Sequence, residues 1–135
     1  MPIIKKGKTK FMFLPVTTST AFTAGDLVTA TSGLLTAATS STTAVLLIGV
    51  IRHTIASTDS DYATSRLVEV EVPVEKNTEW ECVTASLVAG DLLAEVDLTD
   101  AHTVNRGASS VKVAKPTKVI SATLGWFQFK FGGSY

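Results

Sequence analysis

Ala44-Val45-Leu46-Leu47-Ile48-Gly49-Val50-Ile51 is the longest apolar run of this sequence. A helix formed here would have no wet face, and the run is far shorter than the ~20 residues that cross a bilayer. Its length and its β-branched residues favour a buried strand. Gly49 inside the run predicts a bulge or bend where the sheet curls. We therefore expect a curled β-sheet, closed or nearly closed, with a strand from Val45 to about Ile55 near its centre.

The composition is that of one domain with a substantial core. The chain has 135 residues, 45% hydrophobic and 18% charged, which argues against disorder. Its 12 basic residues balance its 12 acidic ones, so it lacks the overall positive field on which non-specific nucleic-acid binding depends. The single Cys82 excludes an internal disulfide and a cysteine-based metal cage. Too few apolar residues follow the lysine-rich start for a signal peptide, so we expect a soluble chain made inside a cell.

Residues 67–75 carry the cleanest period-two pattern. Valines fall on one face and glutamates on the other, which predicts a half-buried antiparallel strand with a solvated acidic side. Residues 79–84 alternate in the same way, so we expect the two segments to form a hairpin. The positions concerned are Val68, Val70, Val72 and Val74 against Glu69, Glu71 and Glu75, and then Trp80, Cys82 and Thr84 against Glu79, Glu81 and Val83.

Other short strands are separated by turn signals. Residues 27–31 and 34–35 form a hairpin around Ser32-Gly33, and the similar turns 24–26 and 89–91 each lead into a strand. Residues 97–107 read as a polar excursion with one helical turn, 111–113 as a short strand broken by Pro116, and 118–123 as a strand before a turn at Gly125. No segment has a helical stripe over ten residues, so eight to ten strands in an all-β sandwich or barrel are expected.

The first 16 residues are expected to form an extended arm before a domain at 17–135. Four lysines resist burial, an apolar stretch follows, and Pro15 ends any central pairing. This is either a frayed terminus leading into an edge strand, or an arm that becomes ordered on a partner as an added strand. In residues 126–131, Phe127, Phe129 and Phe131 form a core face and leave Trp126 on the other. The candidate contact residues are Ile3, Ile4, Lys5, Lys6, Lys8, Lys10, Phe11, Phe13 and Trp126.

The sequence contains no recognisable catalytic, metal-binding or cofactor-binding motif. His53 and His102 are interpreted as ordinary strand-end or loop histidines. Asp59-Ser60-Asp61 begins like a calcium loop, but Thr64 and Val70 stand where that loop requires glycine and glutamate. The glutamates of 69–81 are expected on a solvated face, which could meet a basic partner such as the lysine-rich arm of a neighbouring copy. We expect no enzyme and no cofactor.

Several turn-and-strand patterns resemble those of bacteriophage capsid decoration, or cement, proteins. The resemblance covers most of the chain from Phe22 to Phe129, and the N-terminal arm does not carry it. The segments are Phe22-Thr23-Ala24-Gly25-Asp26-Leu27-Val28, Gly33-Leu34-Leu35-Thr36-Ala37-Ala38-Thr39, Leu47-Ile48-Gly49-Val50, Asp59-Ser60-Asp61-Tyr62-Ala63, Val70-Glu71-Val72-Pro73 and Ala89-Gly90-Asp91.

The resemblance implies a β-tulip-like fold and a virion structural role. Such proteins bind the outer surface of the expanded capsid, commonly as homotrimers at local three-fold positions, and tie major capsid protein subunits together. It therefore implies a chain made in the host cytoplasm that ends on the outside of the phage head, with neither nucleic acid nor membrane as partner. The alternatives are another virion component, such as a head fibre or tail-tube protein, or a small β-barrel module that binds oligosaccharide or single-stranded nucleic acid.

Overall fold

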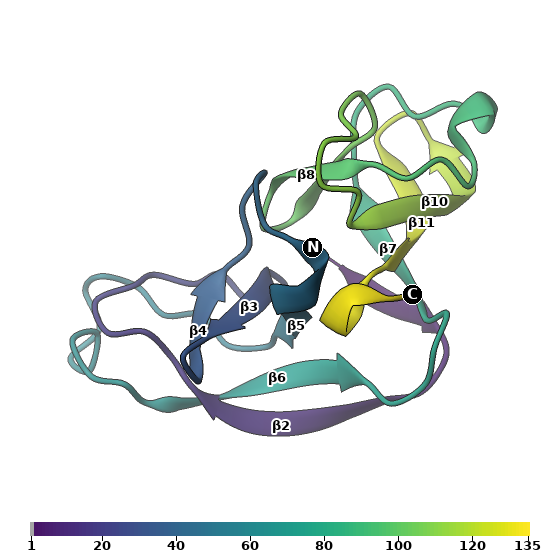
Figure 1. Cartoon of the computed structure of the whole chain (residues 1–135). Helices are drawn as coiled ribbons and strands as arrows, with labels where there is room; N and C mark the ends of the chain where they lie inside the picture. Colours follow the sequence, from purple (N-terminus) through teal and green to yellow (C-terminus); the bar gives the residue numbers. More distant parts are fainter. Residues whose placement is uncertain (1) are drawn as a thin grey trace.

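The computed structural model describes residues 2–135, and in that range the chain is all-β (Figure 1). Eleven strands and three short 3-10 helices are present in the described residues, and the strands form two sheets. The 3-10 helices are η1 (Ala44–Leu46), η2 (Ala89–Asp91) and η3 (Phe131–Gly133).

The first sheet, here called the β5 sheet, has the strand order β2-β6-β5-β3-β4. Its strands are β2 (Thr9–Pro15), β6 (Leu67–Pro73), β5 (Leu47–Ile51), β3 (Leu27–Thr31) and β4 (Leu34–Ala37). All its neighbouring strands are antiparallel. A single parallel bridge between Val16 and Leu35 also joins the end of β2 to the β4 edge.

The second sheet, here called the β7 sheet, has the order β10-β11-β7-β9-β8, and β1 also pairs with β7. Its strands are β10 (Ala114–Ser121), β11 (Leu124–Phe129), β7 (Glu79–Val83), β9 (Thr103–Asn105), β8 (Asp97–Asp100) and β1 (Ile3–Lys6). In Figure 1 the two sheets lie side by side, and the N-terminal segment passes from one to the other.

Two groups of buried side chains hold the sheets. The larger contains Trp80, Cys82 and Phe127 of the β7 sheet together with Leu27 and Val50 of the β5 sheet, so it joins the two. The smaller lies on the other face of the β5 sheet, where loop residues cover it. Its members are Val16, Phe22, Val28, Leu35, Ile51, Ile55, Val68, Val70 and Val72.

The apolar run forms the central strand of its sheet, but a shorter one than expected. β5 begins at Leu47, and Val45 and Leu46 lie in η1 with exposed side chains (68% and 42%). Pairing with β3 ends at Leu47 and pairing with β6 covers only Val50 and Ile51, so residues 44–46 have no neighbouring strand. The expected continuation to residue 55 is also wrong, because Ile55 makes only an isolated bridge to Phe22.

The expected bend at Gly49 is confirmed. The β3–β5 register shifts by one residue between Val28, opposite Gly49, and Thr29, opposite Leu47, which leaves Ile48 as the extra residue of a bulge. A Cβ on Gly49 would overlap the Glu71 carbonyl oxygen and lie 2.9 Å from Val72 Cγ1. Glycine therefore allows β6 to approach this closely.

The predicted hairpin of residues 67–75 with 79–84 is wrong. β6 lies in the β5 sheet and β7 in the β7 sheet, so residues 74–78 connect the two sheets instead of closing a hairpin. The alternation itself is confirmed, because Val70, Trp80 and Cys82 are fully buried. Val74 is an exception at 49% exposure, since β6 has already ended at Pro73.

Four smaller expectations also need correction. Residues 97–107 form the β8–β9 hairpin without a helical turn, because Leu98 and Val104 alternate into the core. β10 includes Pro116, which is accommodated because β10 is an edge strand with a register shift after that residue. Residues 111–113 are not a strand, and Gly125 lies inside β11.

The two Ala-Gly-Asp segments share a side-chain hydrogen bond but differ in backbone conformation, because Gly25 has a positive φ (98°) and Gly90 does not. The carboxylates of Asp26 and Asp91 accept N–H groups three residues earlier, from Thr23 (3.1 Å) and Val88 (2.9 Å). The first turn leads into β3 as expected, but the second does not lead into a strand. It forms η2, and Leu93 follows in a left-handed conformation (φ 66°).

The substitution Gly49→Ala should lower the free energy of unfolding by about 1–3 kcal/mol, the usual cost of overpacking a close contact. Urea denaturation measures the loss. Gly90→Ala is the control, because no atom lies within 4 Å of a Cβ placed there. Equal stability of the two variants would contradict the close approach of β6 to Gly49.

Candidate functional site

The N-terminal segment, expected to form an arm, lies along both sheets of its own chain. β1 pairs with β7, placing Ile3 opposite Glu81 and Ile4 opposite Trp80, and β2 pairs with β6 over its whole length. Ile4 packs against the larger core, whereas Ile3 is 43% exposed. The expected edge strand at Phe11–Leu14 is confirmed as part of β2. Met1 lies outside the described residues, and a domain boundary at residue 16 stays a prediction.

The lysines meet the glutamates within the chain. Lys5 Nζ lies 3.5 Å from Glu81 Oε2, and Lys6 Nζ lies 3.7 Å from Glu79 Oε2. The Lys8 backbone N–H donates to Glu75 Oε1 at 2.8 Å. The attraction expected between a neighbour's arm and this acidic face is thus already present in one copy.

A buried ion pair between Arg52 and Glu71 also binds the N-terminal segment. Arg52 donates through Nε (2.9 Å) and Nη2 (2.5 Å) to Glu71 Oε1, and both side chains are largely buried. Arg52 also donates to the Pro2 carbonyl (3.2 Å), and the Thr9 hydroxyl donates to Glu71 Oε2 (2.6 Å). The expectation of a solvated Glu71 is therefore wrong. On the face of β6 opposite the valines, the ion pair binds both ends of the crossing segment 2–9, Arg52 at Pro2 and Glu71 at Thr9.

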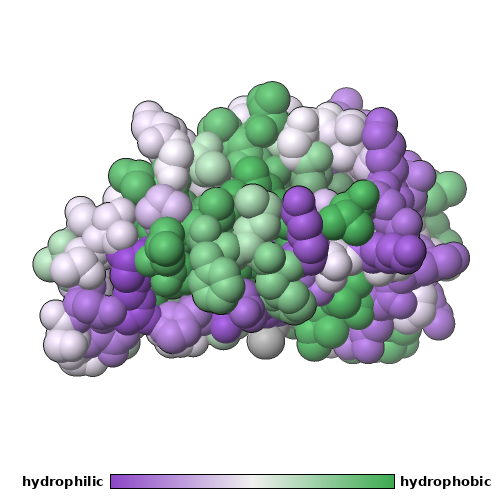
Figure 2. All heavy atoms as spheres, turned by 90° about the horizontal axis from the view of Figure 1, so that it is seen from below, coloured by the Kyte–Doolittle hydropathy of each residue, from purple (hydrophilic) through white to green (hydrophobic). Residues whose placement is uncertain are grey.

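β2 carries the most apolar surface of the candidate residues. Phe11 is 55% exposed and Phe13 is 65% exposed, with Met12 and Leu67 also exposed. We call Phe11, Met12, Phe13 and Leu67 the β2 strip. Phe11, Phe13 and Leu67 of the neighbouring β6 share one face of the sheet, and Met12 lies on the other. Figure 2, which looks at the molecule from below, where β2 runs in Figure 1, shows apolar side chains in the middle of this face with polar ones around them. Lys10 is exposed on the same strand.

An open hollow of about 600 Å³ adjoins the strip at Phe13. Arg66 pairs with Asp61 and contacts His53 in its wall. The other lining residues are Arg52, Leu67, Val68 and Glu69. Arg66 and Asp61 neutralise each other here, and no group of three or more metal-ligating side chains occurs among residues 2–135.

Trp126 lies on the outer face of the β7 sheet, as its alternation predicted. It pairs in register with Glu81, which is in turn opposite Ile3, so the three side chains form one row across β11, β7 and β1. The Lys118 ammonium lies 4.5 Å from the centre of the indole ring. The Trp126 Nε1 is buried without a hydrogen-bond partner in the part of the chain that the structure describes.

The candidate contact residues therefore divide between two surfaces. Lys10, Phe11 and Phe13 belong to the β2 side of the β5 sheet. Ile3, Lys5 and Trp126 belong to the outer face of the β7 sheet, with Lys6 and Lys8 at the crossing between the sheets. Ile4 belongs to neither, because it packs inward.

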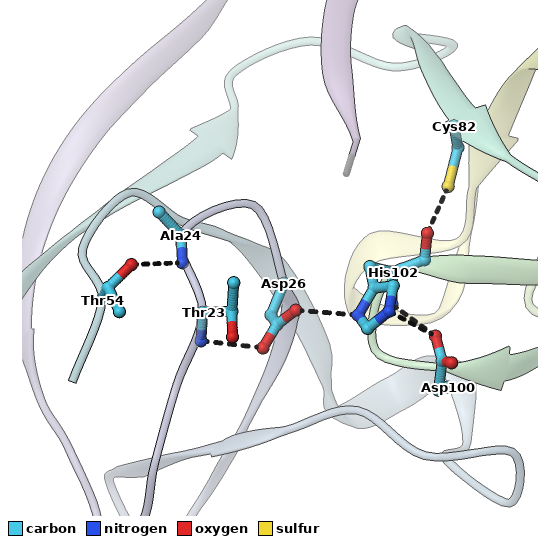
Figure 3. Close-up of polar contacts among 7 residues, drawn as sticks. All are labelled: Thr23, Ala24, Asp26, Thr54, Cys82, Asp100 and His102. Carbon is cyan, nitrogen blue, oxygen red and sulfur yellow. Dashed lines mark hydrogen bonds and ion pairs between the residues drawn. The ribbon is translucent and has the colours of Figure 1, made fainter. Parts of the chain in front are cut away.

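His102 lies in a polar cluster at the joint between the two sheets (Figure 3). Its Nδ1 is 3.1 Å from Asp26 Oδ1, and its Nε2 is 3.5 Å from Asp100 Oδ1. The adjacent Ala101 carbonyl accepts the Leu27 N–H at 2.6 Å. The turn between β8 and β9 is thereby bound to the start of β3.

This cluster does not bring a nucleophile to the imidazole. Cys82 Sγ donates to the His102 backbone carbonyl at 3.3 Å, not to the ring. Burial raises the pKa of the Cys82 thiol to about 12, which leaves no thiolate near neutral pH. Cys82 is therefore a small buried hydrophobic residue. The arrangement supports a structural link between the sheets.

A second structural carboxylate, Asp97, was not singled out from the sequence. Its oxygens accept the backbone N–H groups of Ser110, Val111 and Lys112 at 2.8–2.9 Å, and the residue is 4% exposed. Burial acts to raise the pKa of Asp97, but these three donors outweigh it and hold the pKa below its usual value. Asp97 thus shapes the irregular segment before β10.

Comparison with known proteins identifies no family. No protein-family model matches the sequence, and no curated protein matches it either. None of the helices in residues 2–135 is long and apolar enough to cross a membrane. The class that the structure defines is an all-β protein in two sheets with an uncovered apolar edge strand.

Loss of one partner of the buried pair should be costly. Arg52→Ala should lower the free energy of unfolding by about 3 kcal/mol, because Glu71 would be left buried and unpaired. Lys6→Ala should change it by less than ~1 kcal/mol, because the Lys6 side chain is 74% exposed. Urea denaturation of both variants measures the difference, and equal losses would show that the Arg52–Glu71 pair does not stabilise the fold.

Asp97 should make the stability of the fold depend on pH in the acidic range. A carboxyl whose folded pKa is lowered contributes stability above its unfolded pKa of ~3.9, and this contribution is lost as the pH falls through the folded pKa. Asp97→Asn should lower the melting temperature at pH 7, and its deficit against wild type should shrink between about pH 5 and pH 2. Glu69→Gln is the control, because no hydrogen bond to that carboxylate occurs among the described residues. A deficit independent of pH would contradict this role of Asp97.

Proposed function

We propose that this protein is a virion structural protein that decorates the outer surface of a bacteriophage head and stabilises the expanded shell. The observation that carries the proposal is the β2 strip, an apolar surface on an edge strand that the rest of the described chain leaves uncovered. Monomeric proteins normally protect such strands from other chains. An unprotected apolar edge strand therefore supports a function within a protein assembly. The resemblance to capsid decoration proteins indicates that this assembly is a phage capsid.

The charges and polar clusters support a binding role over a chemical one. The ion pairs at Arg52, Arg66 and Arg106 and the His102 cluster each bind segments of the chain to one another. Balanced net charge allows many copies to lie together on a shell without strong mutual repulsion. The proposal names the major capsid protein as partner, neither nucleic acid nor membrane as ligand, and no enzymatic activity or cofactor.

The proposal includes the finer architecture that the resemblance implies. In it the two sheets form a small barrel or sandwich body of the β-tulip kind, and the N-terminal segment, which pairs within its own chain, contributes Ile3 to the contact with the partner. We assign the β2 strip and the outer face of the β7 sheet to contacts within the assembly, with the β7 face toward the shell. Ile3 and Trp126 share its central row, and salt bridges from Lys5 and Lys6 border it.

Purified protein should co-sediment with expanded shells of the phage that encodes it and raise the temperature at which they rupture. Unexpanded shells are the control for binding to the expanded lattice. Absence of binding to expanded shells would reject the proposal.

The contact face can be tested separately. Ile3→Ser should weaken binding to shells about tenfold, as expected for a partly buried apolar contact residue. Val88→Ser removes a similar exposed side chain, 52% exposed against 43%, from the chain near η2. If both variants bind equally, the shell contact lies elsewhere.

Two alternatives have their own readouts. Density along the tail or at isolated head fibres in electron micrographs of virions would indicate another virion component. Salt-dependent binding of single-stranded DNA or of oligosaccharides would indicate a binding module that uses the exposed Phe11 and Phe13. None is expected, because the net charge is balanced and the aromatic side chains of β11 are buried or covered by Lys118.

A further inference from the structure

One carboxylate in the hollow beside Phe13 has no partner within the chain. Glu69 lines this hollow, is half-buried, and makes no side-chain hydrogen bond or ion pair within residues 2–135. The other charged side chains of the wall are already engaged: Arg52 with Glu71, Arg66 with Asp61, and His53 in contact with Arg66. The hollow therefore keeps one uncompensated negative charge on its wall.

Two exposed apolar side chains flank this carboxylate. Phe13 lies directly opposite Glu69 in the β2–β6 pairing, so the two side chains share one face of the sheet with their Cβ atoms about 5 Å apart. Leu67, two residues before Glu69 on β6, points to the same face. Neither neighbour can donate a hydrogen bond, and partial burial withdraws the carboxylate from water. Glu69 therefore adds nothing to the stability of the isolated fold.

We propose that the hollow binds a basic side chain of a partner protein, an arginine above all. Glu69 accepts the N–H groups of the guanidinium, and the ring of Phe13 stacks on its plane. A guanidinium donates two parallel hydrogen bonds to one carboxylate and also stacks on aromatic faces. A lysine ammonium keeps the charge attraction but lacks the planar pair of donors, so it is bound more weakly.

The apolar residues around Glu69 define the neighbours of that arginine. The hollow is open and has a volume of about 600 Å³, so an extended segment of another protein can enter it. In such a segment, residues two positions apart point to the same side and lie roughly 7 Å apart. When the arginine reaches Glu69, the residues two positions before and after it therefore lie over Leu67 and Phe11. Apolar side chains at these two positions complete the ligand.

The charges of the hollow select against an acidic partner. An acidic segment would meet the unpaired carboxylate, and a phosphate group would find Arg52 and Arg66 already bound to carboxylates. A basic side chain, in contrast, neutralises the one charge that the chain leaves without a partner.

The source of the basic residue rests on the proposed function, which names the major capsid protein as partner, whereas the site itself does not. With this site, each copy has two separate contact surfaces, the outer face of the β7 sheet and the hollow beside the β2 strip. One copy can therefore join two capsid subunits.

A blocked pentapeptide with a central arginine, a leucine at each end and serine between them tests the site without shells. Titrated into the isotope-labelled full chain, it should shift the amide resonances of Phe13, Leu67 and Glu69 with millimolar affinity, because a short flexible peptide loses much of its binding energy to ordering. A central lysine should bind several-fold more weakly, and a central glutamate should not bind. Absence of shifts around the hollow, or equal affinity for the arginine and glutamate peptides, overturns the inference.

Glu69→Gln should weaken binding of the arginine peptide about tenfold and leave the melting temperature no lower than that of wild type, because this carboxylate bonds nothing within the chain. Phe13→Ser should weaken the peptide by a similar factor. Glu75→Gln is the control, since it removes an equal charge at a residue where a glutamine oxygen still accepts the Lys8 N–H. Equal weakening by Glu69→Gln and Glu75→Gln, or a lowered melting temperature in Glu69→Gln, overturns the inference.

Binding to expanded shells identifies the source of the basic residue. Glu69→Gln should weaken binding of the full chain to shells about tenfold, and Glu75→Gln should leave it unchanged. Equal shell binding by Glu69→Gln and wild type overturns the assignment to the capsid protein. So does an oligomer of the wild type in sedimentation equilibrium that Glu69→Gln dissociates, because a second copy then fills the hollow. Failure of the proposed function is distinct, since the wild type then binds no shells while the arginine peptide still binds the hollow.

Discussion

The Arg52–Glu71 ion pair is the constraint on which the arrangement of this molecule depends. Both charges lie where water has little access, so each requires the other and the hydrogen bonds around them. Those bonds reach the Pro2 carbonyl and the Thr9 hydroxyl, on either side of β1. The crossing segment is therefore bound to the interior of the molecule at two points, and β1 and β2 are directed into different sheets.

The course of this segment also explains why the most exposed apolar strand lies at the edge. β2 follows the crossing and pairs with β6, and the described sheet order places no strand outside its first residues. At the end of β2, the bridge between Val16 and Leu35 joins this edge to β4, the opposite edge of the sheet. The β5 sheet is therefore open only along the earlier part of β2, where the exposed aromatic side chains favour contact with another protein. This asymmetry links the packing of the chain to the proposed role in an assembly.

Several elements could be predicted because they depend on neighbours in sequence. The β3–β4 hairpin follows from Ser32-Gly33, both at positive φ (52° and 79°), as a two-residue turn requires. The burial of Trp80 and Cys82 follows from the period-two alternation of residues 79–84. The partner of a strand does not follow from its own alternation, which is why β6 and β7 could not be assigned to different sheets. Pro116 was misread for a related reason: proline interrupts a central strand but not an edge, and only the sheet order shows that β10 is an edge.

The sequence by itself determined the all-β class and the bend at Gly49, because both depend on local geometry or residue type, and it offered the edge strand at Phe11–Leu14 as one of two interpretations of the N-terminal segment. The tertiary structure alone decided that Glu71 is buried against Arg52, that the lysines of β1 bind the glutamates of β7, and that Asp97 holds a loop. Arg52 and Glu71 are 19 positions apart in the sequence, and the other pairs join residues 13 to 76 positions apart. Local propensity carries no information about which distant charges meet, since that is settled only when the strands take their places in the two sheets.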